Sequence, residues 1–163
     1  MKATVYEKYD SPERNIKMIS NQKTARMDTS QKIITIDMKA RLSTLWIFVL
    51  LNVIFRDIHE LFRPGLLAEM MTGIVNGVQM TEGLLLVAGI LLEILIVMVV
   101  LSRVLEYKIN RWTNIIVGSV AIPLLIFTGP ADKDLDDMFF ATVEVVSLAL
   151  IIWLAWKWPK QEA

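Results

Sequence analysis

Residues 83–101 read GLLLVAGILLEILIVMVVL, an apolar run in which Glu93 is the one charged residue. At about 1.5 Å rise per residue, a helix of this length crosses the roughly 30 Å hydrocarbon core of a bilayer. The run therefore predicts a membrane-spanning helix with a carboxylate near its middle. An ionised carboxylate there costs about 2.5 kcal/mol or more unless it is paired, hydrated or protonated, so Glu93 marks a candidate functional site.

Three further apolar segments, residues 43–61, 112–128 and 138–156, suit the same role. The chain has 163 residues, of which 55% are hydrophobic, and a mean hydropathy of +0.50. A soluble bundle is disfavoured because soluble helices keep a polar face that these segments lack. The pattern predicts an all-α fold, a four-transmembrane-helix bundle over residues 41–163, preceded by a cytoplasmic tail over residues 1–40.

The N-terminal tail is expected to be partly disordered or to form an interfacial helix. Residues 1–28 mix both charge signs with few apolar side chains, which is typical of a mobile segment. Thr29 or Ser30 then provides the cap of a helix that leads into the first span. Residues 32–36, KIITI, also suit a strand, but a lone strand has nothing to pair with.

The connection between the first two spans carries several helix breakers. Pro64 and Gly65 end the first span, and residues 66–71 form a short helix expected on the outer surface. The pair Asn76–Gly77 predicts a turn, after which Thr81 caps the second span.

Small residues in the spans predict close helix packing. Gly89, on the same face as Glu93, and Gly118 with Ser119 in the third span are expected to let neighbouring helices approach closely.

Positive charge is concentrated on one predicted side of the membrane. Nine Lys and Arg residues precede Leu42, and the others on this side are Arg103, Lys108, Arg111, Lys157 and Lys160. The positive-inside rule then places both termini in the cytoplasm. The net charge of zero implies no bulk attraction to nucleic acid, so the lipid bilayer is the expected partner and nucleic acid is not.

Several kinds of chemistry are disfavoured by the residue types present. The sequence has no cysteine, which excludes disulfides and thiolate catalysis. It has no Glu-x-x-His pair of the kind that di-metal carboxylate bundles take from two helices. The aspartates within residues 132–137 lack the glycine and glutamate of a calcium loop. No metal or cofactor is expected.

Polar residues from three spans fall at similar depths, about 8 to 16 Å from the outer ends of their helices: Arg56, Glu144, Asn52 and Glu93. We expect these four to bind a small ligand or a proton inside an outward-facing polar funnel. The residues expected at its rim are Asp57, His59, Glu60 and Glu82. Arg56 is the natural counter-ion in this funnel, and its depth suits either Glu93 or Glu144 as its partner.

Three classes of function remain open on this evidence from residues. The favoured one is a non-enzymatic membrane protein that binds or passes a small ligand or a proton. The second is a membrane enzyme that uses Glu93 or Glu144 as a general acid or base on a lipid-soluble substrate. The third is a structural or accessory subunit, in which an Arg56 ion pair only locks the bundle. A homo-oligomer is compatible with each class.

Two stretches, LSTLWIFVLLNVIFRDIHELFRPG at residues 42–65 and VVLSRVLEYKINRWTNIIVG at residues 99–118, carry a family resemblance. Over about residues 42–159 the chain resembles an uncharacterised family of small bacterial four-helix integral membrane proteins, a domain of unknown function. The most specific part is the Leu-Ser-Arg to Asn-Arg-Trp segment. The resemblance implies four spans and a location in the bacterial inner membrane, and it assigns no catalytic residue.

Overall fold

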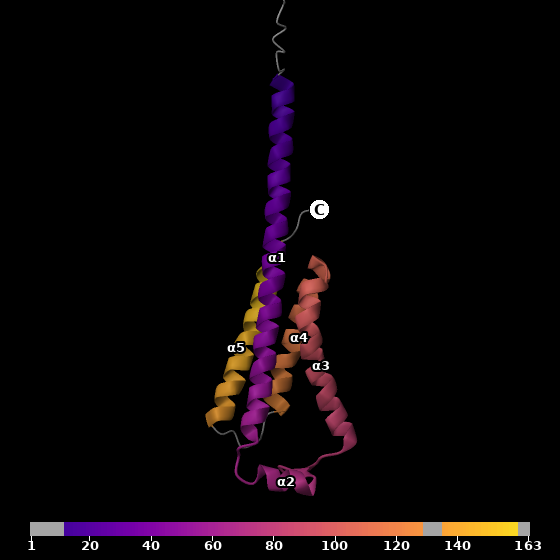
Figure 1. Cartoon of the computed structure of the whole chain (residues 1–163), viewed down its shortest axis with the longest axis vertical. Coiled ribbons are helices and arrows are strands. Elements are labelled where there is room, and N and C mark those ends of the chain that lie inside the picture. The colour runs from indigo at the N-terminus through magenta and orange to yellow at the C-terminus, as the bar shows by residue number, and fades with distance from the viewer. Residues whose placement is uncertain (1–11, 129–134, 160–163) are drawn as a thin grey trace, which may run out of the picture. The chain divides into compact units, whose positions relative to one another are not determined.

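A computed structural model describes residues 12–128 and 135–159 of the chain (Figure 1). In these ranges five α-helices and one short hairpin follow in the order α1 (Pro12–Glu60), α2 (Leu66–Thr72), β1 (Ile74–Val75), β2 (Val78–Gln79), α3 (Glu82–Val104), α4 (Tyr107–Thr128) and α5 (Leu135–Lys157). Helices α1, α3, α4 and α5 are each long and apolar enough to cross a membrane. The predicted all-α fold with four candidate spans is confirmed.

Helix α1 begins much earlier than the sequence suggested. The chain divides into two compact units between Ile36 and Asp37, and α1 belongs to both of them. The expected helix cap at Thr29 or Ser30 is wrong, because helix runs unbroken from Pro12; the expected mobility of the tail stays a prediction. Residues 1–11 lie outside the described part.

The physical reason is that this polar stretch contains good helix formers and no breaker. Proline is favoured at the first helical position, and Pro12 stands there; no further Pro or Gly occurs before Pro64. The hydroxyl of Thr29 donates to the carbonyl of Ala25 at 2.9 Å, so it bonds back along the helix rather than capping one. The KIITI segment is likewise helical.

The connection after α1 forms the expected short helix and turn. Gly73 ends α2 with a left-handed φ of 76°. Strands β1 and β2 pair antiparallel, with Ile74 opposite Gln79, through a turn in which Asn76 and Gly77 both have positive φ, at 50° and 75°. A two-residue turn with positive φ at both positions has a backbone twist that matches the twist of the two strands it connects. In Figure 1, α2 runs crosswise to the long helices.

Helices α4 and α5 make the most extensive helix-to-helix contact of the bundle. A Cβ added at Gly118 would lie 2.9 Å from Cγ1 of Ile152, so glycine is what allows this approach. The same prediction for Gly89 is wrong, because a Cβ there would meet nothing within 4 Å. The buried core beside this pair includes Leu42 and Trp46 of α1.

Helix α3 is packed at one end only. Its C-terminal half contributes the buried residues Met98 and Ser102, and the hydroxyl of Ser43 on α1 donates to the carbonyl of Val99 at 2.9 Å. Residues 82–90 are exposed throughout. Figure 1 shows α3 leaning away from α1 and α5 toward its N-terminal end. The bundle is therefore open beside the first half of α3.

Candidate functional site

The site is built around an ion pair between α1 and α5. Arg56 Nη1 donates to Glu144 Oε2 at 2.7 Å. The Glu144 side chain is fully buried, and that of Arg56 is 18% exposed. The sequence allowed either Glu93 or Glu144 as the partner of Arg56, and in the structure the partner is Glu144. A charge-assisted bond of this length holds the two helices together at the end of α1 that precedes α2.

The ion pair leaves hydrogen-bonding capacity unused on the Glu144 side. Among the described residues, Glu144 Oε1 is buried and has no hydrogen-bond partner. A buried acceptor without a partner is uncommon in folded proteins and calls for a functional explanation or a bound molecule. Arg56 also has a second carboxylate nearby, because its Nε lies 3.9 Å from Oδ1 of Asp57, whose side chain is 67% exposed. Arg56 thus stands between one buried and one exposed carboxylate.

A cavity of about 500 Å³ adjoins Arg56 and is bounded by residues of all four long helices. Arg56 and Asp57 provide its charged groups. The rest of the lining is aliphatic apart from Gly89: Val49, Val53, Leu84, Val87, Ala88, Leu91, Leu92, Leu95, Ala121, Leu124, Leu125 and Leu148. Seven of the lining residues come from α3, on the stretch where that helix leans away. The space is large enough for a drug-sized molecule.

Glu93 does not join the ion pair. Its side chain is exposed, and it lines a different hollow of about 330 Å³ between α3 and α4, together with apolar residues such as Ile94 and Val97. The expected funnel containing Arg56, Glu93 and Glu144 is therefore not formed in the structure. Counting residues gives the depth of Glu93 but not the rotation of α3, which turns Leu92 and Leu95 toward the cavity instead.

Asn52 is half-buried, and its Nδ2 donates to the carbonyl of Phe48 on its own helix at 2.9 Å. Its position one turn from Arg56 places it near the pair in sequence, but the hydrogen bond is local to α1. Asn52 thus lies next to the site, and its hydrogen bond to Phe48 stays within α1.

The predicted rim residues lie in the last turn of α1, where Asp57, His59 and Glu60 stand, and in the first turn of α3, where Glu82 stands. His59 Nε2 lies 3.0 Å from Asp136 Oδ2, a contact that is an ion pair only when the imidazole is protonated. His59 and Glu60 share a hollow of about 240 Å³ with Asp136 and Asp137. Glu82 is exposed in the first turn of α3. No group of three or more His, Asp or Glu in the described ranges could hold a metal ion.

A second polar cluster, in the part of the bundle where α3 meets α4, was not anticipated from the sequence. Trp46 Nε1 donates to Asn114 Oδ1 at 2.6 Å, and the Ser102 hydroxyl donates to the same oxygen at 3.2 Å. Asn110 Nδ2 donates to the Ser102 carbonyl at 2.7 Å, and Asn114 Nδ2 donates to Asn110 Oδ1 at 2.6 Å. All four side chains are fully buried. This network ties α1, α3 and α4 together.

A sequence signal for this cluster existed. Asn110 and Asn114 are spaced four residues apart in an apolar helix, so they share a face, and both lie in the stretch VVLSRVLEYKINRWTNIIVG. Two further residues of that stretch reach α5 and the segment after it. Arg111 Nη2 donates to the carbonyl of Trp156 at 3.0 Å, and the Tyr107 hydroxyl donates to that of Trp158 at 3.2 Å.

The ion pair, the cavity and the buried amide network all lie within one matched segment. A model for a family of unknown function, DUF6326, matches residues 32–163. The chain belongs to this family. No match was found among curated proteins or among solved structures. The DUF6326 segment leaves out residues 1–31, so residues 12–31 at the start of α1 lie outside the match.

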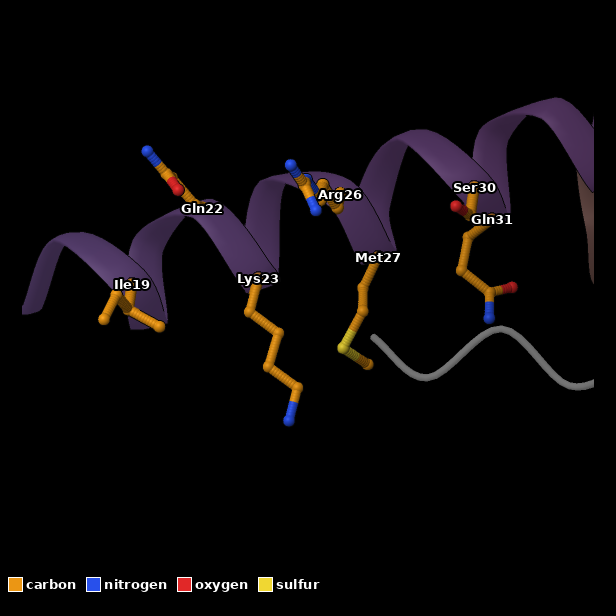
Figure 2. Close-up of a pocket in the computed structure, with 7 residues that line it drawn as sticks. All are labelled: Ile19, Gln22, Lys23, Arg26, Met27, Ser30 and Gln31. Carbon is orange, nitrogen blue, oxygen red and sulfur yellow. The ribbon is translucent and has the colours of Figure 1, made fainter. Parts of the chain in front are cut away.

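That first half of α1 carries a hollow of its own, which we do not assign as a site of this DUF6326 protein. The hollow measures about 430 Å³ and is lined by seven residues (Figure 2): Ile19, Gln22, Lys23, Arg26, Met27, Ser30 and Gln31. Figure 2 shows that all of these side chains come from the single helix α1. One helix supplies no opposing wall, so among the described residues nothing encloses a ligand here.

Proposed function

We propose that this DUF6326 protein is an integral membrane protein of the bacterial inner membrane that binds a small amphiphilic ligand in the cavity between its four long helices. The observation that carries this proposal is the position of the Arg56–Glu144 pair beside a cavity of about 500 Å³ whose lining, apart from Arg56, Asp57 and Gly89, is aliphatic. A molecule with an apolar body and a polar head fits a space that is apolar along its length and charged at one place.

The shape of the bundle supports a binding role over a purely structural one. An ion pair that only locked two helices together would need no open space beside it, and protein interiors are otherwise closely packed. Here Gly89 and the exposed first half of α3 leave room for a ligand, while α4 and α5 are packed tightly around Gly118. The opening beside α3 also suits a ligand that enters sideways from the bilayer.

We further propose that both termini are cytoplasmic, on the basis of the Lys and Arg distribution. With four crossings, the Arg56 end of the cavity then lies toward the outer leaflet. A ligand from that leaflet would place its head near Arg56 and its apolar body against α3. Among the described residues, no contact of Glu144 or Glu93 favours an enzymatic role.

Binding of a neutral amphiphile tests the occupancy of the cavity. A ligand that binds only the folded protein raises its stability in proportion to the ligand concentration over Kd. Dodecanol should therefore raise the unfolding temperature of the protein in phosphatidylcholine nanodiscs. Gly89→Leu should abolish most of that rise, because the new side chain extends into the cavity space that Gly89 lines.

Gly83→Leu is the matched control. It introduces the same side chain into the same helix, also at a position where a Cβ meets nothing within 4 Å, but Gly83 does not line the cavity. It should respond to dodecanol as the wild-type protein does. An equal response in all three proteins would show a general lipid effect and would count against binding in the cavity.

A further inference from the structure

We propose that the ligand of the cavity is a cationic amphiphile, with an ammonium-type head that is received by Asp57 beside Arg56. This inference rests on the proposed function and adds the charge of the ligand. It comes from the balance of charged groups at the polar end of the cavity, where the structure places two carboxylates around one guanidinium.

The first step concerns which carboxylate Arg56 already neutralises. Its Nη1 bonds to Glu144 at 2.7 Å, and both side chains are largely shielded from solvent, so these two groups compensate each other. Asp57 lies farther from the guanidinium, at 3.9 Å, and its side chain is mostly exposed. The negative charge of Asp57 is thus less compensated by Arg56 than that of Glu144, and Asp57 lines the cavity.

The second step compares the two signs of ligand charge. An anionic head placed on Arg56 would compete with Glu144 and stand close to Asp57, so that three negative groups would surround one positive group. A cationic head placed on Asp57 would add a positive charge to a cluster with a negative excess, and would leave the Arg56–Glu144 bond intact. The geometry therefore selects against anions and for cations.

The charged groups near the same end of α1 also carry an excess of negative charge. Among the described residues, the smaller hollow is lined by the carboxylates of Glu60, Asp136 and Asp137 and by the guanidinium of Arg63, and the imidazole of His59 contacts Asp136 at 3.0 Å. A positively charged head approaching this end of the bundle meets a field of favourable sign, which raises the rate of encounter as well as the affinity.

The test compares three amphiphiles that share one alkyl chain and differ in the charge of the head. Radiolabelled dodecylamine, which is protonated at neutral pH, dodecanol and dodecyl sulfate are equilibrated with the full chain in phosphatidylcholine nanodiscs, and uptake by empty nanodiscs is subtracted. Dodecylamine should bind more tightly than dodecyl sulfate by about tenfold, which corresponds to about 1.4 kcal/mol.

Variants of Asp57 make the assignment specific. The side chain is mostly exposed, so Asp57→Asn should fold, and it should reduce the affinity for dodecylamine to that for dodecanol. Glu93→Gln removes a carboxylate from the other hollow and should leave the preference unchanged.

The ammonium group could also be that of an aminolipid. In that case, adding phosphatidylethanolamine to the nanodiscs lowers dodecylamine binding; with a free amine as the ligand it does not, and either result supports a cationic head.

Several outcomes overturn the inference. Dodecyl sulfate binding as tightly as dodecylamine would do so, as would an Asp57→Asn variant with an unchanged preference for dodecylamine. Binding of dodecanol in a manner sensitive to Gly89→Leu, with no preference for the cation, would leave the proposed function standing and remove only the charge assignment. Absence of binding by all three probes would remove both.

Discussion

Arg56 and Glu144 are the residues on which the site depends, because each is costly without the other. Removing one partner of a buried ion pair strands a charge and typically costs about 3 to 5 kcal/mol. Replacing both can be close to neutral, since no buried charge then remains. The pair therefore contributes less net stability than the loss of either member suggests, which is compatible with a role in positioning charge for a ligand.

A double-mutant cycle should show this coupling directly. Arg56→Gln and Glu144→Gln should each destabilise the protein by about 3 kcal/mol, and the double variant should recover about 3 kcal/mol or more relative to the sum of the single losses, so that it loses no more stability than either single variant. Equilibrium unfolding in mixed detergent micelles measures these values.

Glu93→Gln supplies the control for the same cycle. Because Glu93 lines a different hollow, its effect should add to that of Arg56→Gln within about 0.5 kcal/mol. Coupling of Arg56 to Glu93 rather than to Glu144 would mean that α3 is rotated and closed in the membrane, with the arrangement that the sequence alone suggested.

Among the helices, α4 and α5 form the firm part of the bundle and α3 the loose part. Gly118 permits close contact with Ile152, whereas the corresponding space at Gly89 is open. The buried amide network of Trp46, Ser102, Asn110 and Asn114 anchors α3 only at its C-terminal end. A helix that is fixed at one end can move at the other, which would let a ligand enter beside its first half.

Substitution of each of the two glycines by alanine should have different effects on stability in the tightly packed and the loosely packed part. Gly118→Ala places a methyl group 2.9 Å from Ile152 Cγ1, and we expect a loss of about 1 to 3 kcal/mol from overpacking. Gly89→Ala meets no neighbour within 4 Å and should not lower the unfolding free energy; we expect a gain of up to about 1 kcal/mol, because alanine is the better helix former. Similar losses at both positions, measured by the same unfolding assay, would indicate that α3 packs against the bundle along its whole length.

The elements also show what a sequence can and cannot predict. The four candidate spans follow from apolar runs, and the turn at Asn76–Gly77 follows from local backbone preference. The length of α1 was missed because composition suggested mobility, while the absence of breakers allowed a continuous helix. The Arg56–Glu144 pair could be expected from matching depth, but the exclusion of Glu93 depends on how α3 is rotated and tilted, which no single helix encodes.

At the scale of the whole molecule, the proposal requires that the Arg56 end of the cavity faces the outer leaflet. We predict that a phosphatase reporter fused after Ala163 is inactive and that a fluorescent protein fused there is bright, because the last span should end in the cytoplasm. Fusions within the connection at Asn76 should behave in the opposite way. Phosphatase activity at the C-terminal fusion would invert the topology and move the cavity opening to the inner leaflet.

The occupancy of the cavity can be mapped residue by residue. A dodecylamine analogue that carries a diazirine near the end of its alkyl chain is irradiated with the protein in phosphatidylcholine nanodiscs, and the labelled residues are identified by mass spectrometry. Labelling should concentrate on the cavity walls, on Leu92 and Leu95 of α3 and Leu124 and Leu125 of α4, and should fall sharply in Gly89→Leu but not in Gly83→Leu. Labelling spread evenly over exposed residues outside the cavity, such as Leu86 and Val100, and unchanged by Gly89→Leu, would show that the cavity does not hold the ligand.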